Sequence, residues 1–178
     1  MGRGGYDKVV KLSKLLNGYQ KKAQLFVVPF EDIQVAIRDY CRPAHRVVLY
    51  RRMMYRIAQA VAQQKGCLAL ATGEAVGQVA SQTLENLNAV SEVVHLSVFR
   101  PLIGMNKQEI INEARELGTY DISIEPHPDC CSVFMPPRPA TRAKIPDLEM
   151  DETKYPWETL MLEAISKMEC VDLDSLVV

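Results

Sequence analysis

The sequence predicts an α/β fold in which helices cover a parallel, doubly wound sheet. Short apolar runs that end at Pro or Gly alternate with longer segments in which apolar residues recur at helical spacing. Strands that alternate with helices favour a parallel sheet, with ligands bound at the carboxyl ends of its strands. The 178 residues are 48% hydrophobic and carry a formal net charge of -1, which is typical of one globular domain with a sizeable core.

The composition argues against a membrane protein. No uninterrupted apolar run approaches the roughly 20 residues that cross a bilayer. The first residues, MGRGGYDK, contain no apolar signal core, and Tyr6 stands where a myristoylation signal requires Ser or Thr. We therefore expect a cytoplasmic protein with no membrane partner, and the charge balance by itself does not require nucleic acid.

The first part of the chain is expected to form helix, strand, helix, helix and strand. Residues 6–19 have apolar positions at helical spacing, and AQLFVVPF predicts a short buried strand that stops at Pro29. Two acidic residues open a predicted helix over residues 31–40, and a longer helix runs from about Pro43 to a stop at Gly66. CLALA then predicts a second buried strand.

The next part continues the alternation. The segment TGEAVGQVASQTLENL follows CLALA directly, so Gly73 and Gly77 are expected where the chain turns from strand into helix. A third strand is expected within EVVHLSVF. The following helix is predicted to be capped by Asn106, with Glu109 three residues on, and to end at Gly118.

The composition changes beyond residue 124, which divides the predicted single domain into three parts. Residues 6–124 form its expected core. Residues 125–150 predict an extended segment with few hydrogen bonds, because prolines stand at positions 126, 128, 136, 137, 139 and 146. A terminal amphipathic helix is expected from about Pro156, a residue suited to a first helical turn, to about residue 168.

Two features of the predicted core suit an anionic ligand. A glycine loop between strand and helix can present free N–H groups to a phosphate, although this loop lacks the G-x-x-x-x-G-K-[ST] pattern of a Walker site. A tight turn without any ligand explains the glycines equally well. Lys107 falls in the first turn of its predicted helix, where it opposes the helix dipole and indicates a nearby anion. An exposed lysine is also tolerated there at about a few tenths of a kcal/mol.

The five cysteines are an odd number at irregular spacings, so we expect reduced thiols. Cys130 and Cys131 are adjacent, which gives poor disulfide geometry. Their position among prolines and basic residues favours a reactive thiolate. Together with His127 they form too irregular a set for a metal site, and no metal is predicted. The cysteines expected to pack as small hydrophobes are Cys41, Cys67 and Cys170.

Basic residues recur in two places. In the proline-rich segment, Arg138, Arg142 and Lys144 could guide an anionic substrate toward a thiol. On the long helix, a row of arginines could form a basic strip for a phosphate backbone, although a solvated helix face is favoured. This row consists of Arg46, Arg51, Arg52 and Arg56.

Several motifs, taken in order, resemble the tRNA 4-thiouridine synthetase family, also called the thiamine-biosynthesis or tRNA sulfurtransferase family. They are VVPFEDIQVAI, RRMMYRIA, TGEAVGQVASQTLENL, RPLIGMNKQEII, GTYDISI and DCCSVFMPPRPATRAK. The resemblance begins at about Tyr6 and implies the carboxyl-terminal part of a PP-loop ATPase domain. This adenine nucleotide alpha-hydrolase-like domain would lack its first strands here.

The resemblance implies an enzyme that adenylates a uridine of tRNA with ATP, accompanied by Mg2+, and then inserts persulfide sulfur to give 4-thiouridine. It also implies a connection to thiamine thiazole synthesis. The sulfur donor would be a cysteine desulfurase or a rhodanese-type carrier. In the matching motifs, Lys107 assists adenylation, Cys131 handles sulfur, and Cys130 is a possible accessory thiol. The nucleotide-binding positions would be Thr72, Gly73, Glu74, Gly77 and Gln78. The RNA or anion contacts would be Arg138, Arg142 and Lys144.

Several family features are not found in the 178 residues. These are the phosphate-gripping S-G-G-x-D-S loop, the THUMP region and a rhodanese domain. We therefore expect a chain that acts with a segment or subunit carrying the loop, is inactive alone, and forms a homo-oligomer through unpaired strand edges. Two other functions stay open. One is a non-catalytic remnant that binds a partner protein or tRNA. The other is an iron-sulfur protein that uses Cys130 and Cys131, with Cys67 as an optional third ligand.

Overall fold

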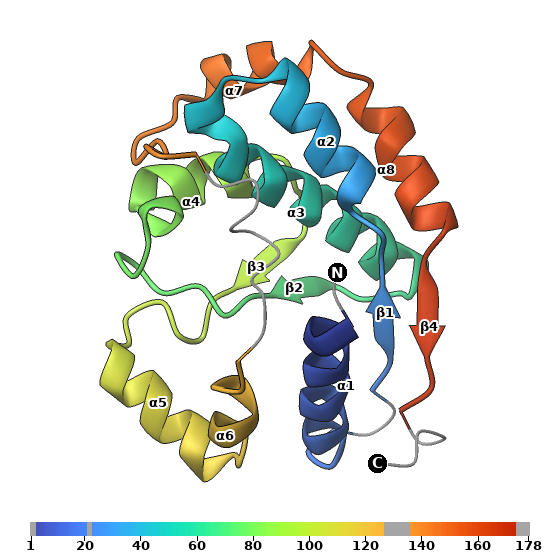
Figure 1. Ribbon diagram of the computed structural model, residues 1–178, viewed down its shortest axis with the longest axis vertical. Coiled ribbons are helices and arrows are strands. Elements are labelled where there is room, and N and C mark those ends of the chain that lie inside the picture. Colours follow the sequence, from blue (N-terminus) through green and yellow to red (C-terminus); the bar gives the residue numbers. More distant parts are fainter. Residues whose placement is uncertain (1–2, 21–22, 127–135, 174–178) are drawn as a thin grey trace. The chain divides into compact units, whose positions relative to one another are not determined.

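The computed structural model describes residues 3–20, 23–126 and 136–173. These residues form two compact units (Figure 1). The described residues of unit 1 lie within Met1–Val28, Asn106–Val133 and Met168–Val178, and those of unit 2 lie within Pro29–Met105 and Phe134–Lys167. Within the described ranges, no helix is both long and apolar enough to cross a membrane.

Unit 2 is built around one long helix, α3 (Arg46–Gln64), which packs against helices and a strand from both halves of the unit (Figure 1). Its other helices are α2 (Glu31–Tyr40), α4 (Leu84–Ser91), α7 (Ile145–Glu152) and α8 (Trp157–Ser166), with short 3-10 turns η1 (Pro43–His45) and η2 (Ala80–Gln82). The largest apolar side chains that α2, α3, α4 and α7 bury completely are Ile33, Ile37, Val48, Leu49, Met53, Val90 and Leu148.

The sheet of unit 2 has two parallel strands, β2 (Ala69–Ala71) and β3 (Ser97–Phe99), with Leu70 opposite Val98. The parallel pairing of CLALA with the strand in EVVHLSVF therefore agrees with the predicted sheet. The expected burial of CLALA is wrong, however. Leu68 of CLALA is 89% exposed, and Phe99 of the neighbouring strand β3 is 63% exposed. Two strands alone bury little of their apolar surface.

Unit 1 contains α1 (Arg3–Asn17), β1 (Leu25–Val27), α5 (Lys107–Glu116), α6 (Tyr120–Ser123) and β4 (Glu169–Val171). β1 pairs antiparallel with β4 rather than joining a parallel sheet. Across the described part of this unit, Leu173 is the only buried apolar side chain. The apolar face of α1 is half uncovered, since Val9 is 39% exposed and Leu16 is 36% exposed. The described part of unit 1 therefore has almost no hydrophobic core of its own.

Local signals predicted the helices well. The helix over residues 31–40 has the predicted bounds, and the long helix ends before Gly66, whose φ is +72°. The capping box of Asn106 and Glu109 is present, and Gly118 follows α5 with a φ of +71°. Each of these signals acts within one turn of chain, so tertiary packing did not overturn it.

Two predictions about the last fifty residues were wrong. Residues 145–150 are not extended but begin α7, with Pro146 in its first turn, where the missing N–H costs nothing. The strand β4 was not predicted at all. Its three residues, ECV, are too few to show a period. In the described ranges the strands form two two-stranded sheets and not one doubly wound sheet.

The row of arginines on α3 is neither a basic strip nor a solvated face. Arg52 is 1% exposed and donates two hydrogen bonds to the Glu152 carboxylate, at 2.8 and 2.9 Å. Arg56 donates two more to the same carboxylate, at 2.6 and 2.9 Å. Residues four apart lie on one helix face, so both guanidiniums reach this carboxylate of α7.

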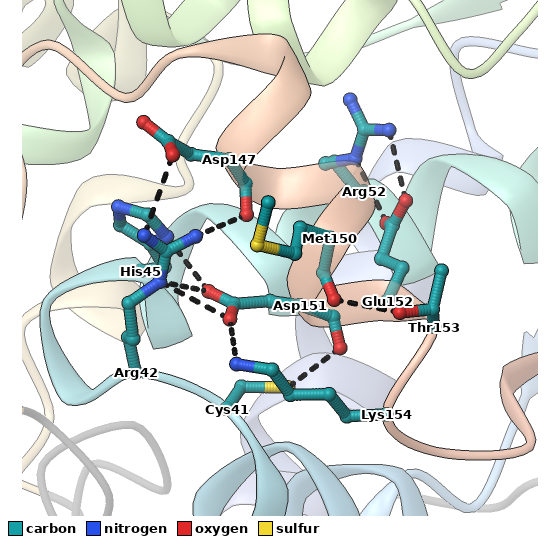
Figure 2. A network of polar contacts seen from close by, with 10 residues as sticks. All are labelled: Cys41, Arg42, His45, Arg52, Asp147, Met150, Asp151, Glu152, Thr153 and Lys154. Carbon is teal, nitrogen blue, oxygen red and sulfur yellow. Dashed lines mark hydrogen bonds and ion pairs between the residues drawn. The ribbon is translucent and has the colours of Figure 1, made fainter.

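A second carboxylate of α7, Asp151, joins that helix to the end of α2 and to η1 (Figure 2). Asp151 is 0% exposed and accepts from Arg42 at 2.9 Å, from Lys154 at 2.6 Å and from the His45 ring at 2.8 Å. The Cys41 thiol donates to its carbonyl at 3.5 Å. Burial and the neighbouring Asp151 charge raise the pKa of the Cys41 thiol to about 12, so this thiol stays protonated and unreactive.

We predict that Asp151 makes the fold acid-sensitive. Burial acts to raise its pKa, but hydrogen bonds from Lys154, Arg42 and His45 outweigh burial and hold the pKa below the ordinary value. Asp151 is therefore protonated more readily in the unfolded chain than in the folded one. The stability it contributes is full above about pH 4 and is lost as the pH falls through the folded-state pKa.

Urea unfolding between pH 5 and pH 2 tests this prediction. Asp151→Asn should be less stable at pH 5 and should lose less stability on acidification than the wild type. Asp32→Asn, at a side chain that is 75% exposed, is the control and should keep the wild-type slope. A slope for Asp151→Asn equal to that of the wild type would contradict the prediction.

Candidate functional site

The candidate site in unit 2 is the segment from Thr72 to Thr83, which connects β2 to α4. Its first half is tied to the chain that follows β3. The backbone N–H of Thr72 donates to the Phe99 carbonyl at 3.0 Å, and that of Val76 donates to the Ile103 carbonyl at 3.1 Å. These bonds fix the loop beyond the carboxyl ends of two parallel strands, where ligands bind in open α/β sheets.

Gln82 closes the loop. Its side-chain Oε1 accepts from the Ala75 N–H at 2.8 Å, and its carbonyl accepts from the Gly77 N–H at 2.9 Å. Gly77 has a φ of +78°, which a residue with a side chain rarely adopts. The helix begins only at Leu84, so the glycines lie in a longer loop and not in a tight strand-to-helix turn.

The loop exposes some residues with free backbone N–H groups and buries the charged side chain of Glu74. In the described ranges, no residue accepts a hydrogen bond from the backbone N–H of Gly73, Glu74 or Gln78, and Gly73 and Gln78 are exposed. Free amides of this kind can bind phosphate oxygens. The Glu74 side chain, in contrast, is only 6% exposed and points into the unit.

The Glu74 carboxylate is held by a dense set of donors. The Tyr55 hydroxyl donates to it at 2.7 Å, Arg100 Nε at 2.6 Å and Thr72 Oγ1 at 3.1 Å, and Arg51 forms an ion pair with its other oxygen. Sequence reasoning assigned no role to Arg100 or Tyr55, and for the row that contains Arg51 it favoured a solvated helix face over a basic strip. A direct contact between the Glu74 carboxylate and a nucleotide is therefore disfavoured, although its backbone N–H remains free.

The basic end of the proline-rich segment is attached to the start of α4. Asn86 is 0% exposed and donates through Nδ2 to the carbonyls of Ala80 and Ala140, at 2.9 and 2.8 Å. Its Oδ1 accepts from the Ala143 N–H at 3.0 Å. This one side chain fixes the 140–143 segment beside the end of the loop. Sequence reasoning missed Asn86, because an asparagine in a helix resembles any polar surface residue.

Thr83 has a double role at the same place. Its Oγ1 accepts from the Asn86 N–H at 3.2 Å, which caps α4, and its hydroxyl donates to the Thr141 carbonyl at 2.6 Å.

Of the predicted anion-contacting residues, Arg142 is 83% exposed on the side chain and pairs with Glu85 at 3.2 Å. An exposed pair is worth about 1 kcal/mol or less, so Arg142 can exchange Glu85 for another anion. Arg138 and Lys144 are exposed.

The remaining predicted residues lie elsewhere. Lys107 is the first residue of α5 in unit 1 and is exposed, and none of the contacts recorded among the described residues involves its side chain. Cys130 and Cys131 fall outside the described residues. The expectation for the other cysteines was right only for Cys41. The remaining two, Cys67 and Cys170, are exposed.

Comparison with known proteins identifies the family of this chain. The family model described as "Thiamine biosynthesis protein (ThiI)" matches residues 2–156. The chain belongs to this family. The probable tRNA sulfurtransferase of Halothermothrix orenii is 48% identical over 169 residues, which cover 94% of this chain and 43% of that relative. The probable tRNA sulfurtransferase of Thermus thermophilus is 47% identical over 163 residues, 92% of this chain and 40% of that relative.

The fold agrees with this family membership. A crystal structure described as a 4-thiouridine synthetase–RNA complex with bound ATP superposes with a TM-score of 0.88 at 37% identity. The match covers 96% of this chain and 45% of that one. The chain thus spans less than half the length of each of these three proteins. Membership of the ThiI family and the mixed helix and strand fold confirm the sequence-based recognition.

We predict that Asn86 holds the basic segment on α4. Asn86→Asp keeps the size of the side chain but replaces its donor group with a charged oxygen that faces two carbonyls. A buried acceptor without a partner costs about 1 to 3 kcal/mol, so backbone amides of residues 140–144 should exchange with solvent at least about tenfold faster. Hydrogen exchange followed by mass spectrometry measures this rate.

The control for this experiment is Asn88→Asp, the same change at an exposed position of α4. Exchange at residues 140–144 in this variant should match the wild type. Equal protection of the segment in wild type and Asn86→Asp would show that other contacts hold it.

Proposed function

We propose that the chain is the carboxyl-terminal part of the PP-loop domain of a tRNA sulfurtransferase that makes 4-thiouridine in the cytoplasm. Membership of the ThiI family and the RNA- and ATP-bound structural neighbour support this proposal. The observation that carries it is the 72–83 loop. This loop lies beyond the ends of two parallel strands, with free backbone N–H groups on its exposed side and a rigid, ion-paired base beneath. It suits the phosphates or the adenosine of ATP.

The proposed active form includes a segment that carries the S-G-G-x-D-S loop. Two observations support this requirement. The matched relatives are more than twice as long as the matched region, and in the described part of unit 1 Leu173 is the only apolar side chain that is buried. A unit without a core is only marginally stable by itself. We propose that the parallel β2–β3 pair of unit 2 belongs to a doubly wound sheet whose remaining strands lie in that segment.

The proposed reaction has two stages. First, a uridine oxygen of the tRNA attacks the α-phosphate of ATP and pyrophosphate leaves, while Lys107 stabilises charge that develops on the phosphates. Arg138, Arg142 and Lys144 would contact the tRNA backbone, and their exposure suits that role. Positive side chains placed near a polyanion strengthen its binding without specifying a sequence.

In the second stage, the terminal sulfur of a donor persulfide attacks the activated uridine carbon and AMP leaves. The Cys131 thiolate then attacks the inner sulfur of the donor. A disulfide forms between Cys131 and the donor, the bond to the transferred sulfur breaks, and 4-thiouridine is released. Cys130 is a neighbouring accessory thiol that cannot carry out this exchange in place of Cys131.

Mg2+ would accompany the ATP phosphates rather than occupy a site made by this chain alone. In the part of the chain that the structure describes, no group of three or more His, Cys, Asp and Glu residues is placed to hold a metal. The carboxylate at the loop, Glu74, is already bound by Arg51 and Arg100. The described residues therefore do not fit a protein-held Mg2+, and no step above depends on one.

The first test of the proposed function compares the two adjacent cysteines. In the presence of the loop-bearing segment, ATP, tRNA and a persulfide donor, Cys131→Ser should abolish 4-thiouridine formation and leave AMP formation measurable. Cys130→Ser should keep part of the thiolation activity. Nucleoside analysis of the digested tRNA measures the product. Equal loss in the two variants would refute this division of roles.

The second test concerns Lys107. Lys107→Ala should slow adenylation, measured as pyrophosphate release, by at least about thirtyfold, because one preorganised charged group contributes about 2 kcal/mol or more to the transition state. Lys167→Ala removes an exposed lysine that pairs weakly with Asp32, at 3.7 Å, and should react like the wild type. Pyrophosphate release by Lys107→Ala at the wild-type rate would show that Lys107 is an ordinary exposed lysine with no role in adenylation.

A further inference from the structure

A buried charged cluster lies directly beneath the candidate nucleotide loop. Glu74 belongs to the loop, Arg51 and Tyr55 belong to α3, and Arg100 follows β3. Side-chain exposure is 6% for Glu74, 15% for Arg51 and 18% for Arg100. Three separate parts of unit 2 therefore meet at one carboxylate. The reaction proposed above assigns no role to the two arginines or the tyrosine.

The contacts of this cluster reach both ends of the loop. Glu74 accepts from the Thr72 hydroxyl at 3.1 Å, next to the end of β2. Arg51 pairs with Glu74 and also donates through Nη1 to the carbonyl and hydroxyl of Ser81, at 3.0 and 3.3 Å, near the start of α4. The guanidinium of Arg51 therefore contacts Glu74 near the start of the loop and Ser81 near its end, and so connects the two ends.

Arg100 holds the cluster from the other side. Its Nε donates to Glu74 at 2.6 Å, and its Nη2 donates to the Tyr55 hydroxyl at 3.2 Å and to the Ser91 hydroxyl at 2.5 Å. Two arginines thus share one carboxylate, which leaves one positive charge in excess. Burial, with the nearby Arg100 charge, lowers the pKa of Arg51. An excess positive charge beneath a loop favours a polyanion on it.

We propose that Arg51, Arg100 and Tyr55 act through Glu74 as positioning residues for the nucleotide. This proposal rests on the proposed function. The cluster fixes the backbone of the loop so that the free amides near Gly73 and Gln78 are ordered before ATP arrives. Preordering of this kind reduces the entropy lost on binding, so its loss raises the KM for ATP more than it lowers kcat.

A second buried carboxylate cluster of unit 2, around Asp151, provides a matched control. Asp151 is at least as deeply buried as Glu74 and is also held by two cationic side chains, Arg42 and Lys154, and by the ring of His45. It connects α7 to η1 and to the end of α2, and none of its recorded contacts involves the loop. Glu74→Gln and Asp151→Asn each remove one buried charge, but only Glu74→Gln removes it beneath the loop.

The first experiment uses hydrogen exchange on the 178-residue chain and does not depend on the proposed function. Glu74→Gln should raise the exchange rates of the Ala75, Val76 and Gly77 amides about tenfold or more, as expected for loss of a charged buried hydrogen bond. Asp151→Asn should leave these rates within about twofold of the wild type. Tyr55→Phe removes only the hydroxyl and should show a smaller increase, which provides a milder variant if Glu74→Gln does not fold.

The second experiment measures AMP formation by the chain together with the loop-bearing segment. Glu74→Gln should raise the KM for ATP about tenfold with a smaller fall in kcat. Arg51→Lys keeps the charge and should lie between Glu74→Gln and the wild type, while Asp151→Asn should keep the wild-type KM.

Equal loop exchange in Glu74→Gln and Asp151→Asn, or faster loop exchange without a change in KM, would overturn the positioning role. Absence of AMP formation in the wild-type assembly would instead refute the proposed function. The exchange result would then show only that the cluster orders the loop.

Discussion

The folding of unit 2 depends on buried carboxylates that satisfy the arginines of α3. Arg51 pairs with Glu74 of the loop, while Arg52 and Arg56 share Glu152 of α7. The paired residues lie between 23 and about 100 positions apart in the chain. Removal of one partner would leave a buried charge uncompensated, which costs about 3 to 5 kcal/mol. The helix α3 thereby fixes both the loop and α7 through buried ion pairs between arginine and carboxylate.

The two units differ in the interactions that stabilise them. Unit 2 combines a buried apolar core with ion pairs that are shielded from solvent. The described part of unit 1 relies on strand pairing between β1 and β4 and on contacts such as that of Lys8, whose ammonium donates to the carbonyls of Ser123 and Glu125 at 2.8 and 2.6 Å. Polar contacts of this kind contribute little without an apolar core. The candidate loop belongs to the better-packed unit, whereas Lys107 belongs to the other.

The sequence predicted what is decided locally. Helix bounds, the Asn106 cap and the glycine stops follow from interactions within one turn, and the structure has them. The role of the arginines could not be predicted, because a row of arginines looks solvent-facing until the carboxylates at positions 74 and 152 are known to fold back onto it. The partner of β1 was missed for the same reason, since β4 lies about 140 residues further along the chain. Lys107 and Cys131 rest on the family resemblance and not on geometry.

The central claim is that this chain supplies one wall of a nucleotide site and that a loop-bearing segment supplies the rest. Calorimetric titration of the 178-residue chain with ATP tests it most directly. The free amides of the 72–83 loop are too few to offset the cost of immobilising a charged ligand. We therefore expect a Kd no tighter than about 1 mM for the chain alone, which corresponds to roughly 4 kcal/mol. Addition of the segment should tighten binding at least about tenfold, or by 1.4 kcal/mol. Micromolar binding of ATP by the chain alone would contradict the account.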